Sequence, residues 1–208
     1  QGNGASLTYT KLRDTSQAIR ENVDNNGDIT DVAGIAVTVT TASNVTQYGQ
    51  IVTAAGNNGS VAGAVSDAVG NLTNVTLPGA TSVTAVITNA TKDLTGTALD
   101  SDVTVLDIST NSVQGAIFDI ADIDGGVTIL NTDNAGTFTI KDSATTLAAN
   151  TSLINGKAVV IDDTGATAAT VQELNAIQAV ASSVTYTKLR DSSANIRANV
   201  DSNGAITD

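Results

Sequence analysis

The sequence predicts an α/β fold of repeated strand–helix–strand–helix units with parallel strands, stacked into an elongated solenoid. One observation is a duplication: residues 8–31 recur as residues 185–208, offset by 186 − 9 = 177, with six differences in 24 positions. The other is that strand-like and helix-like segments alternate at both ends of the chain, and each helix returns the chain for parallel pairing. Repeats that cannot bury their own apolar face must stack on a neighbour. The alternative is a β-solenoid with extended coils in place of helices, because Thr and Val are abundant.

The first predicted unit covers residues 1–59. We expect a strand at 7–10, a short helix capped by Asp14 and a strand at 35–39. A longer helix follows, capped near Thr41 or Ser43. Its apolar face repeats with helical spacing and comprises Val45, Tyr48, Ile51 and Val52.

A second clear unit covers residues 136–183 and has the same order of elements. It comprises a strand at 138–140, a short helix capped by Asp142, a strand at 158–161 and a helix that begins after Thr164 or Thr167. Residues 184–208 start a further unit that copies 7–31. Residues 60–135 are degenerate middle repeats, with helices predicted at 61–72 and 113–118 and strands at 82–88, 102–108 and 127–130.

Composition argues against an enzyme. The chain lacks His, Cys, Met and Trp, which removes the usual general base, thiol nucleophiles and common zinc ligands. A net charge of −12 disfavours nucleic acid as a partner. No apolar run approaches the length of a membrane span, so we expect a chain that is not membrane-spanning. The absence of cysteine fits a secreted protein, which then cannot form wrong crosslinks during export.

Three segments carry a resemblance to a known family: residues 137–150, 156–161 and 167–177. Their pattern resembles the repeats of giant repeat-rich secreted bacterial surface proteins, which are adhesin-like and common in cyanobacteria. The resemblance implies an extracellular or cell-surface location and a structural or adhesive role. The duplicated segment departs from the plainer form of the pattern because its Tyr-Thr-Lys-Leu-Arg-Asp stretch is two residues longer.

These observations predict an extracellular structural protein that assembles head to tail into a filament, sheath or surface layer. The last residues copy a segment near the start instead of forming a polar cap, and uncapped repeats associate end to end. The partners are then copies of itself, either as separate subunits of a homopolymer or as tandem repeats of one longer chain. The alternative function is an adhesin segment that binds glycans or other cells.

Acidic residues after the first short helix form a candidate calcium loop. Alternating oxygen ligands and a glycine at the sharp turn suit Ca²⁺, the one cofactor that the sequence suggests. The loop lacks the twelve-residue spacing and the final Glu of an EF-hand, and the second copy has Ala205 in place of Asp28. An Asx-rich turn is the simpler interpretation and is favoured. The candidate ligands are Asp24, Asn26, Asp28 and Asp31.

The duplicated segment also carries four of the nine basic residues. Arg side chains could pair with carboxylates of a neighbouring unit, or simply be solvated. The expected contact residues between repeats or subunits are Tyr9, Arg13, Arg20, Tyr186, Arg190 and Arg197. A second acidic cluster, comprising Asp119, Asp122 and Asp124, is expected to be a solvated loop.

Overall fold

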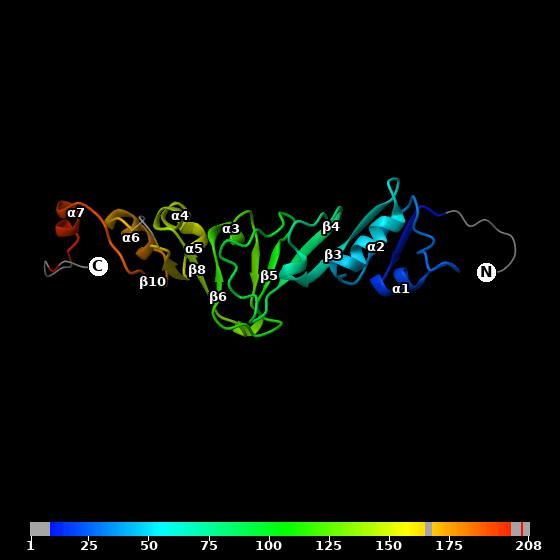
Figure 1. The fold of residues 1–208 in the computed structure, drawn as a ribbon, viewed down its shortest axis with the longest axis horizontal. Coiled ribbons are helices and arrows are strands. Elements are labelled where there is room, and N and C mark those ends of the chain that lie inside the picture. Colours follow the sequence, from blue (N-terminus) through cyan, green and yellow to red (C-terminus); the bar gives the residue numbers. More distant parts are fainter. Residues whose placement is uncertain (1–8, 165–167, 201–204, 206–208) are drawn as a thin grey trace. The chain divides into compact units, whose positions relative to one another are not determined.

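The computed structural model describes residues 9–164, 168–200 and 205 (Figure 1). Two compact units are present. Unit 1 contains the residues up to Ile87, with Ala98–Asp107 and Thr128–Leu130. Unit 2 contains Thr88–Thr97, Ile108–Val127 and the residues from Asn131 onward.

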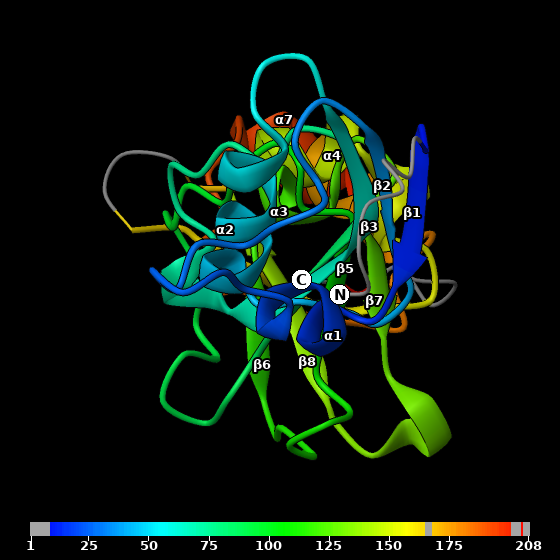
Figure 2. The ribbon, with the colours of Figure 1, turned by 90° about the vertical axis from the view of Figure 1, so that its right-hand side faces the viewer.

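Unit 1 is built on a six-stranded sheet in the order β1-β2-β3-β4-β5-β7, and every neighbouring pair is parallel. Its strands are β1 (Lys11–Asp14), β2 (Ala36–Val39), β3 (Ser60–Ala68), β4 (Ala80–Val86), β5 (Val105–Asp107) and β7 (Thr128–Leu130). Two helices accompany them, α1 (Ser16–Glu21) and α2 (Val45–Ala55), with the 3₁₀ turn η1 (Val69–Asn71). Helix α2 lies beside β3 (Figure 2).

Unit 2 has a four-stranded sheet in the order β10-β9-β8-β6, again all parallel. Its strands are β6 (Ala116–Phe118), β8 (Phe138–Asp142), β9 (Ala158–Ile161) and β10 (Ser183–Thr185). Its helices are α3 (Ile120–Ile123), α4 (Ala144–Ala149), α5 (Thr151–Ile154), α6 (Val171–Gln178) and α7 (Ser193–Ala198), with the 3₁₀ turn η2 (Thr132–Asn134). Parallel sheets with helices in both units confirm the predicted α/β class; neither sheet is closed.

Helix α2 shows why these segments fold as they do. Asn44 caps it through a capping box with Gln47, one residue beyond the predicted Ser43. Tyr48, Ile51 and Ala55 are buried along one face. The helix ends at Gly56, where φ is +66°, a value that glycine adopts without a steric cost.

The caps of the short helices also differ from those predicted. Thr15 caps α1 and Ser143 caps α4, each one residue after the expected Asp14 and Asp142. Thr170 caps α6, beyond the predicted Thr164 and Thr167. The aspartates bind instead to the amide of the residue that follows them, at 2.7 Å in both cases. The Asp before the cap therefore holds the turn from strand to helix.

Two predicted helices in the middle of the chain are wrong. Residues 61–72 form β3 and η1, and residues 113–118 contain β6. Val61, Val65 and Val69 have helical spacing, but Val61 and Val65 also fit an alternating strand, and both are buried. Pairing with β2 on one side and β4 on the other decides for the strand.

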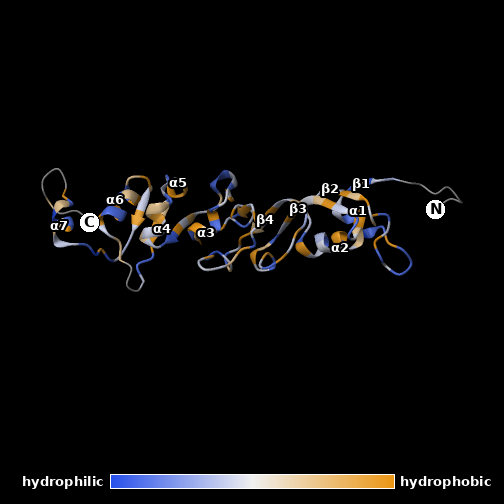
Figure 3. Ribbon diagram, turned by 90° about the horizontal axis from the view of Figure 1, so that it is seen from above, coloured by the Kyte–Doolittle hydropathy of each residue, from blue (hydrophilic) through white to orange (hydrophobic). Residues whose placement is uncertain are grey.

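The core of each unit consists of branched aliphatic side chains, with Tyr48 and Phe118 as the fully buried aromatics among the described residues. Figure 3 shows apolar residues within the helices and strands and polar residues in many connecting loops. Across the described residues, none of the helices has the length and apolar character needed to span a membrane.

Candidate assembly interface

The duplicated segment has the same backbone in both places. We call residues 8–31 copy 1 and residues 185–208 copy 2. Helix α1 begins at Ser16 and α7 at Ser193, 177 residues later. The N-cap φ and ψ are −69° and 154° at Thr15 and −63° and 150° at Ser192. The segment therefore specifies its own local structure, whatever surrounds it.

Copy 2 is hydrogen-bonded to residues that precede it. An Asp191 carboxylate oxygen accepts from the Val171 amide at the start of α6 at 3.1 Å. The amides of Thr187 and Lys188 donate to Asp163 at 2.6 Å and 2.7 Å. These bonds, those from Thr187 first, hold the pKa of Asp163 below its usual value.

Copy 1 is hydrogen-bonded to residues that follow it. β1 pairs with β2, from Lys11 opposite Ala36 to Asp14 opposite Val39. The Thr40 amide donates to the Asp14 carbonyl at 2.8 Å. The Ser16 amide donates to the Thr41 hydroxyl at 3.1 Å.

The matching groups of copy 2 lack these partners. In the part of the chain that the structure describes, the Asp191 carbonyl and the Ser193 amide have no hydrogen bond of this kind. Copy 1 therefore makes the forward bonds and copy 2 makes the backward bonds of one and the same segment.

Burial differs between the copies on one face. Ile19 is 2% exposed and Ser16 is buried, whereas Ile196 is half-buried and Ser193 is exposed. Val23 and its counterpart Val200 are 46% and 45% exposed, so the loop beyond the helix is equally open in both. The difference lies on the face that β2 and α2 cover in copy 1.

The predicted contact residues lie in and around this face. The Tyr9 hydroxyl donates to the Asp31 carbonyl at 2.8 Å, and burial followed by the Asp31 charge raises the pKa of Tyr9. Arg20 is half-buried, and its Nε has no hydrogen-bond partner among the described residues. It lines a cavity of about 770 Å³ with Gly49, Gln50, Thr53 and Ala54 of α2.

The other predicted contact residues are at the surface: Arg13, Arg190 and Arg197 are exposed and Tyr186 is half-buried. Over residues 9–164 and 168–200, the ion pair present is Lys141–Asp162 at 3.7 Å. The expected pairing of these arginines with carboxylates of a neighbouring unit stays a prediction for an assembled state.

The candidate calcium loop is organised by its own hydrogen bonds. An Asp24 carboxylate oxygen accepts from the amides of Asn26 at 2.8 Å and Asp28 at 3.0 Å. Asp31 accepts from the Asn22 side chain at 3.1 Å. The described residues contain no group of three or more His, Cys, Asp or Glu placed to hold a metal ion. Most of the matching loop of copy 2 lies outside the described residues, and calcium binding stays a prediction.

Carboxylates at strand ends form a second set of functional groups, which the sequence analysis did not identify. Asp67, Asp142 and Asp191 each accept from the first amide of a helix 20 to 22 residues earlier, at 3.0–3.2 Å. They link successive strand–helix segments within each unit. The detectable signal was an Asp directly before the cap, as in Asp142-Ser143 and Asp191-Ser192.

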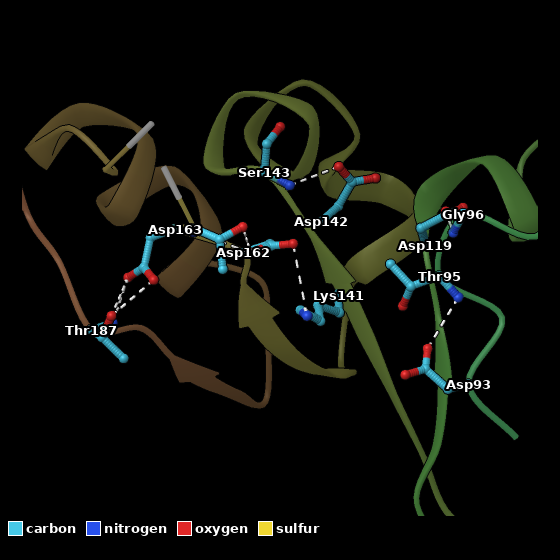
Figure 4. A network of polar contacts seen from close by, with 11 residues as sticks. Asp93, Thr95, Gly96, Asp119, Lys141, Asp142, Ser143, Asp162, Asp163 and Thr187 are labelled. Carbon is cyan, nitrogen blue, oxygen red and sulfur yellow. Dashed lines mark hydrogen bonds and ion pairs between the residues drawn. The ribbon is translucent and has the colours of Figure 1, made fainter. Parts of the chain in front are cut away.

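In unit 2 these carboxylates line a small cleft of about 240 Å³, which includes Asp119, Asp142 and Asp162 (Figure 4). The predicted solvated loop nearby is instead α3, capped by Asp119 and Asp122 in a capping box. Asp122 is 5% exposed, and burial raises its pKa to about 7, with the charges of Asp119 and Asp93 adding to the effect.

Comparison of the chain with protein-family models, with curated proteins and with solved structures found no match. The observations that bear on function are therefore those of the chain itself, and the most informative is the difference between the two copies.

Proposed function

We propose that this chain is an extracellular structural protein whose copies join head to tail into a filament, sheath or surface layer. One observation carries the proposal: two near-identical segments have the same backbone, but one is covered by β2 and α2 and the other is open on that face. A surface with a known internal cover is complementary to the same cover in another copy. Contacts of this heterologous kind generate open polymers when they do not close.

The strand pairing supports a stack of repeats with one direction. Within unit 1, Lys11 pairs with Ala36 and Val105 with Thr128, 25 and 23 residues apart. Within unit 2, Ala158 pairs with Ser183, also 25 residues apart. Parallel pairing of strands at short, similar intervals is what a solenoid requires, and in such an architecture each repeat contacts its neighbours along the axis.

The extracellular location rests on the resemblance to secreted repeat-rich surface proteins and on the absence of cysteine. The polymer could be made of separate subunits or of tandem repeats in one longer chain. Both versions place the same surfaces in contact.

Sedimentation velocity over a range of concentrations, followed by negative-stain microscopy, tests the proposal. We expect concentration-dependent growth and regular fibres. Dispersed rods that do not associate would favour the adhesin segment, and a monomer at every concentration would contradict assembly. Denaturing electrophoresis of native material then distinguishes subunits, with a band near 20.8 kDa, from a far larger tandem chain.

A further inference from the structure

Building on the proposed function, we infer that the head-to-tail contact forms by segment exchange. Residues 186–200 of one chain take the position that residues 9–23 occupy in a second copy. Lys188–Asp191 then pairs with β2 of that copy, and α7 packs against its α2. The occupant of the open face is therefore the 36–55 region of another copy of this chain.

The exchange completes both sets of hydrogen bonds. In place of copy 1, Asp191 would offer its carbonyl to the Thr40 amide, as Asp14 does at 2.8 Å. Asp191 would keep its bond to Val171, and Thr187 its bond to Asp163. Asp14 has no counterpart of the bond to Val171 among the described residues. The exchanged joint thus makes bonds that neither copy makes alone.

Simple stacking of intact chains is less favourable because it would place like charges together. Copy 2 laid in register against the outer edge of β1 would put Lys188 beside Lys11 and Arg190 beside Arg13. After exchange, Arg190 lies opposite Thr38, as Arg13 does now, and Lys188 lies opposite Ala36. Exchange therefore avoids both repulsive pairs.

The displaced segment costs little. Residues 9–23 leave contacts that residues 186–200 then remake with nearly the same side chains, which is the condition under which swapping between copies is easy. Ile196 goes from half-buried to the position of Ile19, which is 2% exposed. Its burial favours the joint.

Disulfide trapping tests the register, and the cysteine-free chain makes it clean. The double variant Arg190→Cys/Thr38→Cys should give a disulfide-linked ladder on oxidation under assembly conditions, because directly opposed residues meet the distance requirement. Arg190→Cys/Arg13→Cys should give no ladder. Arg13→Cys/Thr38→Cys is the control, since these residues are paired within one chain and should crosslink without forming multimers.

A ladder from Arg190→Cys/Arg13→Cys would overturn exchange in favour of stacking. No ladder from either pair, with the control crosslinked and the parent chain assembled, would also overturn it. In both cases the proposed function would stand. A parent chain that stays monomeric would contradict the function and the exchange together.

Matched isoleucine variants supply a second readout. Ile196→Ala should raise the concentration needed for assembly about tenfold to a hundredfold, because it removes the side chain that becomes buried. Ile19→Ala should lower that concentration, because it weakens the segment that must leave. Equal effects of the two variants would contradict exchange.

Discussion

At the scale of single residues, one buried hydroxyl joins three segments of unit 1. Tyr48 of α2 is fully buried, and its hydroxyl lies 3.2 Å from the Val61 carbonyl and 3.0 Å from that of Pro78. Burial raises the pKa of this tyrosine. The hydroxyl therefore satisfies carbonyl groups of β3 and of the turn before β4.

Tyr48→Phe should lower the free energy of unfolding by about 1–2 kcal/mol, because two buried acceptors lose their donor. Urea denaturation followed by circular dichroism measures the change. Tyr9→Phe is the control and should cost less than about 1 kcal/mol, because its bond to the Asp31 carbonyl is exposed. Equal losses would show that the Tyr48 hydroxyl has no special role.

Asp122 gives unit 2 a pH dependence. Its pKa is about 7 in the folded chain against 3.8 for an ordinary Asp, so the folded state holds the extra proton between these values. Its stabilising effect is complete below pH 3.8 and is lost as the pH rises to about 7.

Asp122→Asn should therefore remove this loss. The variant should be more stable than the parent at pH 8, by roughly 2–4 kcal/mol, and similar to it at pH 3. Comparing variant with parent cancels the opposite trend of Asp93 and Asp162, whose pKa values are lowered by bonds from the Thr95 and Thr164 hydroxyls. Thermal melts across pH measure it, with the exposed Asp124→Asn as a control that should leave the curve unchanged.

At the scale of elements, the approach of β3 to β2 depends on a glycine. A Cβ at Gly63 would lie 2.8 Å from the Val39 Cβ and 3.2 Å from the Val39 carbonyl oxygen. The register between β3 and β4 also shifts between Gly63 and Ala64. This strand therefore has no room for a side chain at its centre.

Gly63→Ala should destabilise unit 1 by about 1–3 kcal/mol, because the added methyl meets backbone as well as side chain. Gly49→Ala in α2 should do the opposite and stabilise by about 0.5–1 kcal/mol, because a Cβ there meets nothing within 4 Å. Chemical denaturation of both variants checks the pair. A stable Gly63→Ala variant would mean that β2 and β3 can move apart freely.

At the scale of the whole molecule, the acidic balance motivates the calcium prediction. We expect millimolar calcium to raise the melting temperature relative to a chelator, by linkage worth about 1–3 kcal/mol at ten to a hundred times Kd. Asp28→Ala, which gives copy 1 the residue of copy 2, should reduce the increase. An unchanged melting temperature in the parent would leave residues 24–31 as a plain Asx turn.

Sequence reasoning reached the outer elements more easily than the middle. β2, β9, α2 and α6 follow the predicted segments, because their apolar periodicity has one interpretation. β3 was predicted to be a helix, because the valines of residues 61–72 fit both periods. The strand-end carboxylates were missed because their partners lie 20 or more residues away.

The sequence by itself determined the α/β class and the conformation of the duplicated segment, since α1 and α7 have matching bounds and cap angles in different surroundings. Those features depend on caps and turns within a few residues. Tertiary structure alone decided that Ile19 is buried while Ile196 is half-open, and that Asp122 holds its proton near neutral pH. Burial depends on which distant strand or helix lies against a residue, and a local sequence, even a repeated one, does not contain that neighbour.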